Sequence, residues 1–182
     1  MYFDETSLNL WHHRRKVWMA KSDPFKVRLA QVQGHNLTVL GAISSKRSTL
    51  CYDVNTGTDH KTVLTFFRHL CKEWKFSGNV VLVMDNHPSH DNKALQEYLD
   101  KKGISVRFLP PASSPLNPIE EVWAAVKRHF ATTILELNGD VNMMSFEQVL
   151  RQCIETHVQN KCSKYSTSIF EVYQQVLDGK LV

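Results

Sequence analysis

The chain has 182 residues, of which 42% are hydrophobic and 22% charged, with a formal net charge of +4 and a pI near 8.9. This composition is that of a globular protein large enough to bury a sizeable core. The mild basic excess is compatible with a polyanionic partner but does not establish one. No apolar run approaches the ~20 residues that cross a bilayer, so we expect no membrane partner.

The four cysteines show no Cys-x-x-Cys spacing and no paired histidine. The sequence therefore indicates neither a zinc site nor a disulfide framework. An intracellular, reducing compartment is the simplest interpretation.

The N-terminal third has the composition and turn signals of antiparallel strands. The first expected strand runs from Tyr2 to Trp11, and a basic turn from His12 to Lys16 follows it. Further strands are expected over residues 27–33, 37–43 and 48–54.

The apolar spacing then changes, and helices alternate with strands. Residues 59–76 and 91–102 carry the apolar spacing of amphipathic helices. Between them, residues 80–84 predict a strand that is buried on both faces. A further strand is expected over residues 104–109, and a helix opens at Asn117-Pro118 with Asn117 as its cap. This order matches an α/β fold of the ribonuclease-H type, with a mixed five-stranded sheet flanked by helices.

Two amphipathic segments close the chain, one from Ser145 to Val158 and a shorter one around Ile169. We expect residues 1–133 to form the α/β domain. Residues 134–182 are expected to form a C-terminal helical extension packed on it.

Two carboxylates occupy positions that suggest a metal site. Asp85 ends the buried strand, where open α/β sheets place their ligands. Glu120 lies in the first turn of the helix after Asn117, and a helical projection puts it at the edge of the apolar stripe, whereas Glu121 faces solvent. Trp123 belongs to that stripe and is expected in the core.

Three sequence blocks carry a family resemblance. They are Phe3–Thr6 followed by Arg14–Trp18, Met84–His90 (MDNHPSH), and Phe108–Pro111 followed by Ser114–Trp123 (SPLNPIEEVW). These blocks resemble the catalytic domain of mariner-like transposases and their bacterial insertion-sequence relatives, the group with a DDE/D triad. The 34 residues between Asp85 and Glu120 also match the family spacing.

The resemblance implies that Asp4, Asp85 and Glu120 are the catalytic triad. They would bind two Mg²⁺ or Mn²⁺ ions, which prefer carboxylate oxygens. The implied activity is metal-assisted hydrolysis and strand transfer of DNA, with transposon ends and target DNA as partners. The family cuts DNA as dimers, so a homodimer is expected, located in the nucleus of a eukaryote or otherwise in the cytoplasm.

Each triad residue also has a plainer explanation. Glu120 has the spacing of a capping box with Asn117, and Asp85 can start a turn with Asn86. Asp4 precedes Glu5, and strand alternation sends only one of the two inward.

Several residues are candidates for contact with DNA, although basic clusters are usually solvated surface. The candidates are Arg14, Arg15, Lys16, His90, Lys127 and Arg128. A supporting role near the site is the alternative for His90. Metal ligation by His87 and His90 is a further alternative, but loop histidines more often form hydrogen bonds.

The family normally carries an N-terminal helix-turn-helix region that recognises transposon ends, and the chain begins at the first catalytic strand. We therefore expect a fragment that lacks this region. The alternative is a catalytically silent, transposase-derived module that binds DNA or a protein. A cellular ribonuclease-H-like nuclease that acts on RNA hybrids is a third possibility.

Overall fold

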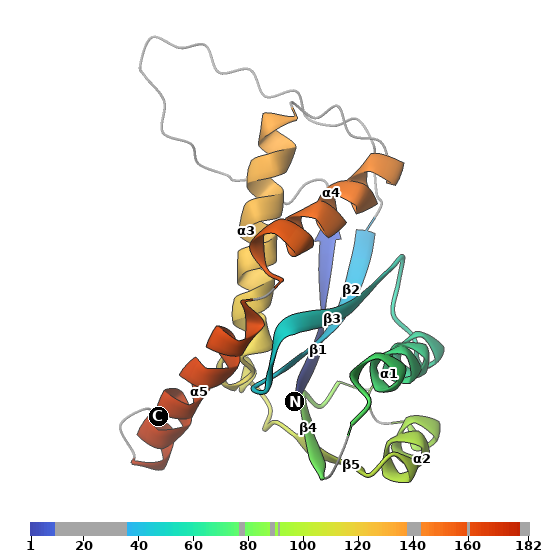
Figure 1. Ribbon diagram of the computed structural model, residues 1–182, viewed down its shortest axis with the longest axis vertical. Helices are drawn as coiled ribbons and strands as arrows, with labels where there is room; N and C mark the ends of the chain where they lie inside the picture. The colour runs from blue at the N-terminus through green and yellow to red at the C-terminus, as the bar shows by residue number, and fades with distance from the viewer. Residues whose placement is uncertain are drawn as a thin grey trace.

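The computed structural model describes residues 1–9, 36–76, 79–87, 90, 92–137, 143–159 and 161–178. A mixed five-stranded sheet lies at its centre, with helices on both faces (Figure 1). The strands are β1 (Tyr2–Asn9), β2 (Asn36–Ser44), β3 (Arg47–Asn55), β4 (Val80–Met84) and β5 (Ile104–Phe108). The helices are α1 (His60–Trp74), α2 (Lys93–Lys101), α3 (Ile119–Glu136), α4 (Met143–His157) and α5 (Cys162–Leu177), and a short 3-10 helix, η1, covers Ser114–Leu116.

The strand order is β3-β2-β1-β4-β5, so β1 is the central strand. It pairs antiparallel with β2 over eight residue pairs and parallel with β4 on its other side. β4 and β5 are also parallel. The predicted order of strands and helices is thus confirmed, while the strand expected over residues 27–33 lies outside the described residues.

The two faces of the sheet carry separate cores. On the face covered by α1 and α2, Phe3 of β1 packs against Phe66 and Phe67 of α1, with ring centroids 5.3 and 4.8 Å away. On the opposite face, α3, α4 and α5 pack together over the sheet, and Trp123 and Phe130 are buried there as expected. Successive β1 side chains therefore enter different cores, because strand side chains alternate between faces.

The prediction that β4 is buried on both faces is wrong. Leu82 and Met84 are buried against α1 and α2, but Val81 on the other face is 49% exposed. The reason is that α3 and α5 make their sheet contacts mainly with β1, β2 and β3.

Local signals in the sequence explain where α1 and α2 begin and end. The carboxylate of Asp59 accepts a hydrogen bond from the amide of Thr62 at 2.7 Å and caps α1. Gly103 follows α2 with a φ of 70°, a conformation that favours glycine.

The C-terminal helices share a core with the sheet. Phe146 and Ile154 of α4 and Ile169 of α5 belong to the same buried cluster as Trp123. α3 continues beyond residue 133 to Glu136, and the division into residues 1–133 and 134–182 stays a prediction. Among the described residues, no helix is both long and apolar enough to cross a membrane.

Candidate active site

The structure brings Asp4, Asp85 and Glu120 to one cleft of about 330 Å³. Asp4 is the third residue of β1, Asp85 directly follows β4, and Glu120 is the second residue of α3. The remaining lining comes from Asn86 and His87 after β4, from residues 109–114, and from Asn117. Three separate elements therefore each contribute one carboxylate to a shared, solvent-accessible hollow.

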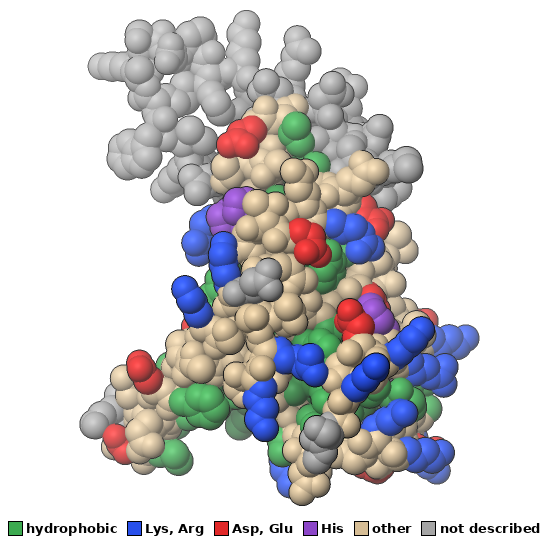
Figure 2. Space-filling model, viewed as in Figure 1, with side chains coloured by type: hydrophobic (Ala, Val, Ile, Leu, Met, Phe, Trp, Pro, Cys, Tyr) green, Lys and Arg blue, Asp and Glu red, His purple; other side chains and the backbone are tan. Residues whose placement is uncertain are grey.

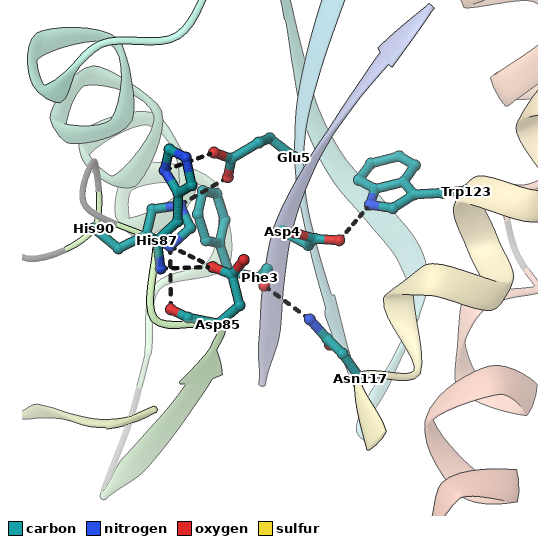
Figure 3. Close-up of polar contacts among 8 residues, drawn as sticks. All are labelled: Phe3, Asp4, Glu5, Asp85, His87, His90, Asn117 and Trp123. Carbon is teal, nitrogen blue, oxygen red and sulfur yellow. Dashed lines mark hydrogen bonds and ion pairs between the residues drawn. The ribbon is translucent and has the colours of Figure 1, made fainter. Parts of the chain in front are cut away.

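Asp4 points toward α3, whereas its neighbour Glu5 points to the opposite face of the sheet (Figure 3). The Asp4 side chain is only 8% exposed, and its Oδ2 accepts a hydrogen bond from Trp123 Nε1 at 3.2 Å. Burial, followed by repulsion from Glu120, raises the pKa of Asp4 to about 7, and the charges of Glu5 and Asp85 add to the increase. The carboxylates that line the cleft therefore repel one another.

Gly41 makes room for the indole that contacts Asp4. It lies opposite Asp4 in the β1–β2 ladder, and a Cβ at this position would lie 2.4 Å from the Trp123 ring. Any larger residue would push the ring away from the sheet. The apolar stripe of the helix predicted that Trp123 lies in the core, but no local pattern indicated its contact with Asp4.

Glu120 is half-buried at the start of α3, and Glu121 is exposed, as the helical projection predicted. The Oε1 atom of Glu120 accepts a hydrogen bond from Ser114 Oγ of η1. The capping interpretation of Asn117 is wrong, because its Oδ1 accepts no hydrogen bond from the described residues. Its amide nitrogen donates to the carbonyl oxygen of Phe3 at 3.3 Å. The side chain of Asn117 thus ties the start of α3 to β1.

Asn117 also presents an unused acceptor. The residue is 3% exposed and lines the cleft, and its Oδ1 has no hydrogen-bond partner among the described residues. A buried carbonyl oxygen without a partner is costly, and such groups usually have a water or an ion as partner.

His90 links Asp85 to Glu5 (Figure 3). Its Nδ1 lies 2.7 Å from Asp85 Oδ1, its Nε2 lies 2.7 Å from Glu5 Oε2, and the imidazole is fully buried. Burial alone would lower the pKa of His90, but its hydrogen bonds to Asp85 and Glu5 outweigh burial and raise the pKa to about 10. The hydrogen bond from His90 in turn lowers the pKa of Asp85.

The turn expected at Asp85 coexists with this arrangement, since the amide of His87 donates to Asp85 Oδ1 at 3.4 Å.

Glu5 is the functional candidate that sequence reasoning missed. The available signal was strand alternation, which sends Glu5 to the face opposite Asp4. The contact of Glu5 with His90 joins segments that are far apart in the sequence, so no local sequence pattern predicts it.

The predicted DNA contacts have different surroundings. His90 is buried with both nitrogens engaged, which favours a supporting role over direct contact with DNA. On α3, Lys127 is half-buried and Arg128 exposed, while Arg14, Arg15 and Lys16 lie outside the described residues. Figure 2 shows further Lys and Arg side chains gathered over α1 and α2.

The chain is similar to several known transposases. It is 24% identical over 138 residues to the Tcb2 transposase of Caenorhabditis briggsae, covering 71% of this chain and 50% of that protein. The Mos1 transposase in a paired-end complex with the left transposon end superposes with a TM-score of 0.70 at 16% identity, over 98% of this chain and 54% of that one. The Mos1 catalytic domain with Raltegravir and Mn gives a TM-score of 0.61 at 13% identity, over 98% of this chain and 81% of that one.

These structural likenesses confirm the ribonuclease-H-like fold. The chain spans about half the length of Tcb2 and of the Mos1 chain in the paired-end complex. Residues 1–136 match the family described as DDE superfamily endonuclease. Because this match covers most of the sequence, the chain belongs to the DDE superfamily endonucleases, the family that its three sequence blocks resemble.

Proposed function

We propose that this chain is the catalytic part of a transposase that cleaves and joins DNA, with Asp4, Asp85 and Glu120 as its metal-binding triad. The observation that carries this proposal is the convergence of the three carboxylates, from three separate elements, on one cleft. The transposase relatives support DNA as the substrate, including transposon ends and target DNA.

The residues of the cleft fit a hard divalent cation. Carboxylate oxygens and an amide oxygen are ligands that Mg²⁺ and Mn²⁺ prefer. The orphaned Oδ1 of Asn117 is an acceptor for a cation or its bound water, and a cation would also relieve the repulsion that raises the pKa of Asp4. The Mn in a Mos1 structure supports this choice, and two ions remain our proposal. When bound, such ions activate an attacking water or 3′-hydroxyl group and stabilise the leaving oxygen.

The chain itself holds the carboxylates in place before any ligand arrives. Trp123 orients Asp4, His90 orients Asp85, and Ser114 orients Glu120. Each donor restricts its carboxylate to a narrow range of rotamers, so little conformational entropy is lost when a ligand binds. Asp4 must be ionised to act as a ligand, and its raised pKa means that protons compete with the cation near neutral pH.

DNA contacts are proposed for the basic residues on α3 and after β1. Lys127 and Arg128 follow Glu120 on the same helix, and Arg14, Arg15 and Lys16 are the second group. Each phosphate contact makes DNA binding more sensitive to salt. We also propose that the active form is a homodimer.

The test is nicking of supercoiled DNA in Mg²⁺ or Mn²⁺, together with Mn²⁺ binding followed by electron paramagnetic resonance. Asp85→Asn should reduce nicking by more than about 100-fold. Loss of a residue that hydrogen-bonds to a metal ligand lowers activity by up to about 100-fold, and loss of the ligand itself should lower it at least as much. It should also weaken Mn²⁺ binding. The matched control is Asp100→Asn on the exposed surface of α2, which should behave like the unmodified chain.

Nicking that Asp85→Asn leaves unchanged would overturn the assigned mechanism. Salt-dependent DNA binding with neither nicking nor Mn²⁺ binding would also overturn the proposal and favour the catalytically silent module.

A further inference from the structure

A second group of potential metal ligands lies on the opposite side of β1 from Asp4. It consists of Glu5, His87 and His90, whose ligand atoms all lie within 4.8 Å of one another. Figure 3 shows both imidazoles and the Glu5 carboxylate directed toward one another, away from Trp123. None of the three belongs to the proposed triad.

We propose that Glu5, His87 and His90 bind a divalent transition-metal ion of the zinc class, at a site that borders the carboxylate cleft through His87 but uses none of the three triad carboxylates. Two imidazole nitrogens and one carboxylate oxygen suit zinc and its neighbours, whereas Mg²⁺ prefers oxygen ligands alone. Three protein ligands also leave a fourth tetrahedral position for water.

His90 already has the surroundings of a metal-bound histidine. Such a histidine usually donates a hydrogen bond from its second ring nitrogen to a carboxylate or a carbonyl group, and this bond fixes the ring orientation. Nδ1 of His90 faces both acceptor types of Asp85, at 2.7 Å from Oδ1 and 3.2 Å from the backbone oxygen. The Phe3 ring packs against the imidazole in a T-shaped arrangement, with centroids 5.3 Å apart. Nε2 is thereby directed at Glu5.

An ion can reach the site from solvent past the other two ligands, His87 and Glu5. The His87 side chain is 57% exposed, and that of Glu5 is 19% exposed. Nε2 of His90 lies 2.7 Å from Glu5 Oε2, and Nδ1 of His87 lies 3.8 Å from Glu5 Oε1. Ligand atoms around tetrahedral zinc are about 3.3 Å apart. The three ligand atoms lie within 4.8 Å of one another, so they would draw together by up to about 1.5 Å when the ion binds. The ion would replace the proton between His90 Nε2 and Glu5.

An ion at this position would join β1 to the loop that carries Asp85. It would therefore stabilise the folded chain in proportion to its concentration and affinity. Ligand spacing in the sequence could not reveal this site, because Glu5 comes from β1 and the two histidines follow β4.

The test measures Zn²⁺ binding to the metal-free full chain by calorimetry, with Co²⁺ absorption as a probe of nitrogen ligation. His87→Ala and Glu5→Gln should each weaken one Zn²⁺ equivalent at least tenfold, remove its Co²⁺ bands and abolish the rise in melting temperature caused by Zn²⁺. His60→Ala changes another exposed histidine and is the matched control. Because His87 is exposed, its replacement should leave the fold intact.

Glu120→Gln separates this site from the proposed catalytic one. It should weaken Mn²⁺ binding in the cleft and leave the Zn²⁺ equivalent unchanged. Equal Zn²⁺ stoichiometry and affinity in the unmodified chain, His87→Ala and Glu5→Gln would overturn the inference, whatever the outcome of the nicking test.

Discussion

The clearest physical prediction concerns the charge of Asp4 in the absence of cations. Folding raises its pKa from 3.8 to about 7, chiefly through burial and then through Glu120. Between these values the native state keeps a proton that the unfolded chain releases. The proton is therefore lost from the unfolded chain first, and stability falls as the pH rises from about 4 to about 7 and then stays level.

The size of this effect follows from the two pKa values. At about 1.4 kcal/mol per pKa unit, the charge of Asp4 costs roughly 4 kcal/mol at pH 8 and less than about 2 kcal/mol at pH 5. Asp4→Asn removes the charge and keeps an acceptor for Trp123. The free energy of unfolding of this variant, relative to the unmodified chain, should therefore rise by about 2–3 kcal/mol between pH 5 and pH 8.

Urea unfolding at both pH values, in the presence of EDTA, measures this difference. Contributions from titrating groups that do not interact with Asp4 cancel, because both proteins share them. The reasoning would be refuted if the difference between variant and unmodified chain were the same at pH 5 and pH 8. In Mg²⁺ the advantage of the variant should shrink, since the cation stabilises only the ionised carboxylate.

Two other substitutions, Gly41→Ala and Glu120→Gln, test the surroundings of Asp4, and Gly57→Ala is the control for the first. Gly41→Ala places a Cβ against the Trp123 ring and should lower the free energy of unfolding by about 1–3 kcal/mol in urea, as overpacking usually does. Gly57→Ala, where a Cβ meets no atom within 4 Å, should be neutral or slightly stabilising, and equal effects at both glycines would contradict the packing argument. Glu120→Gln should lower the pKa of Asp4 in a ¹³C NMR titration, while burial keeps it above 3.8; an unchanged pKa would mean that the two carboxylates do not interact.

Much of the fold could be predicted because local patterns specify it. The apolar spacing of α1, the cap of α1 at Asp59 and the end of α2 at Gly103 are each set by neighbouring residues. The strand β4 was misjudged because its valine-rich sequence permits burial on either face. Only the placement of α3 and α5 over β1–β3 leaves Val81 exposed.

The site was predictable to a different extent. The sequence blocks identify Asp4, Asp85 and Glu120, and the structure places all three at one cleft. The groups that orient the three carboxylates were harder to predict, because in the sequence Trp123 has the position of an ordinary apolar residue and His90 that of a loop histidine. Their hydrogen bonds to acidic side chains depend on contacts between distant segments, which periodicity does not report.

The eight-residue ladder between β1 and β2 has a consequence for how this site can change. Asp4 and Glu5 are adjacent, so a slip of one residue in β1 would exchange them between the two faces of the sheet. A slip that brings Glu5 to the place of Asp4 would press a longer side chain on Trp123, and a slip in the other direction would bring Asp4 to the place of Glu5, where it falls short of His90. The composition of the chain would be unaltered, yet both groups of ligands would be lost together. Insertion or deletion of a single residue in this strand is therefore far more damaging than many substitutions, because the position of each ligand depends on the register of β1 as much as on the side-chain type.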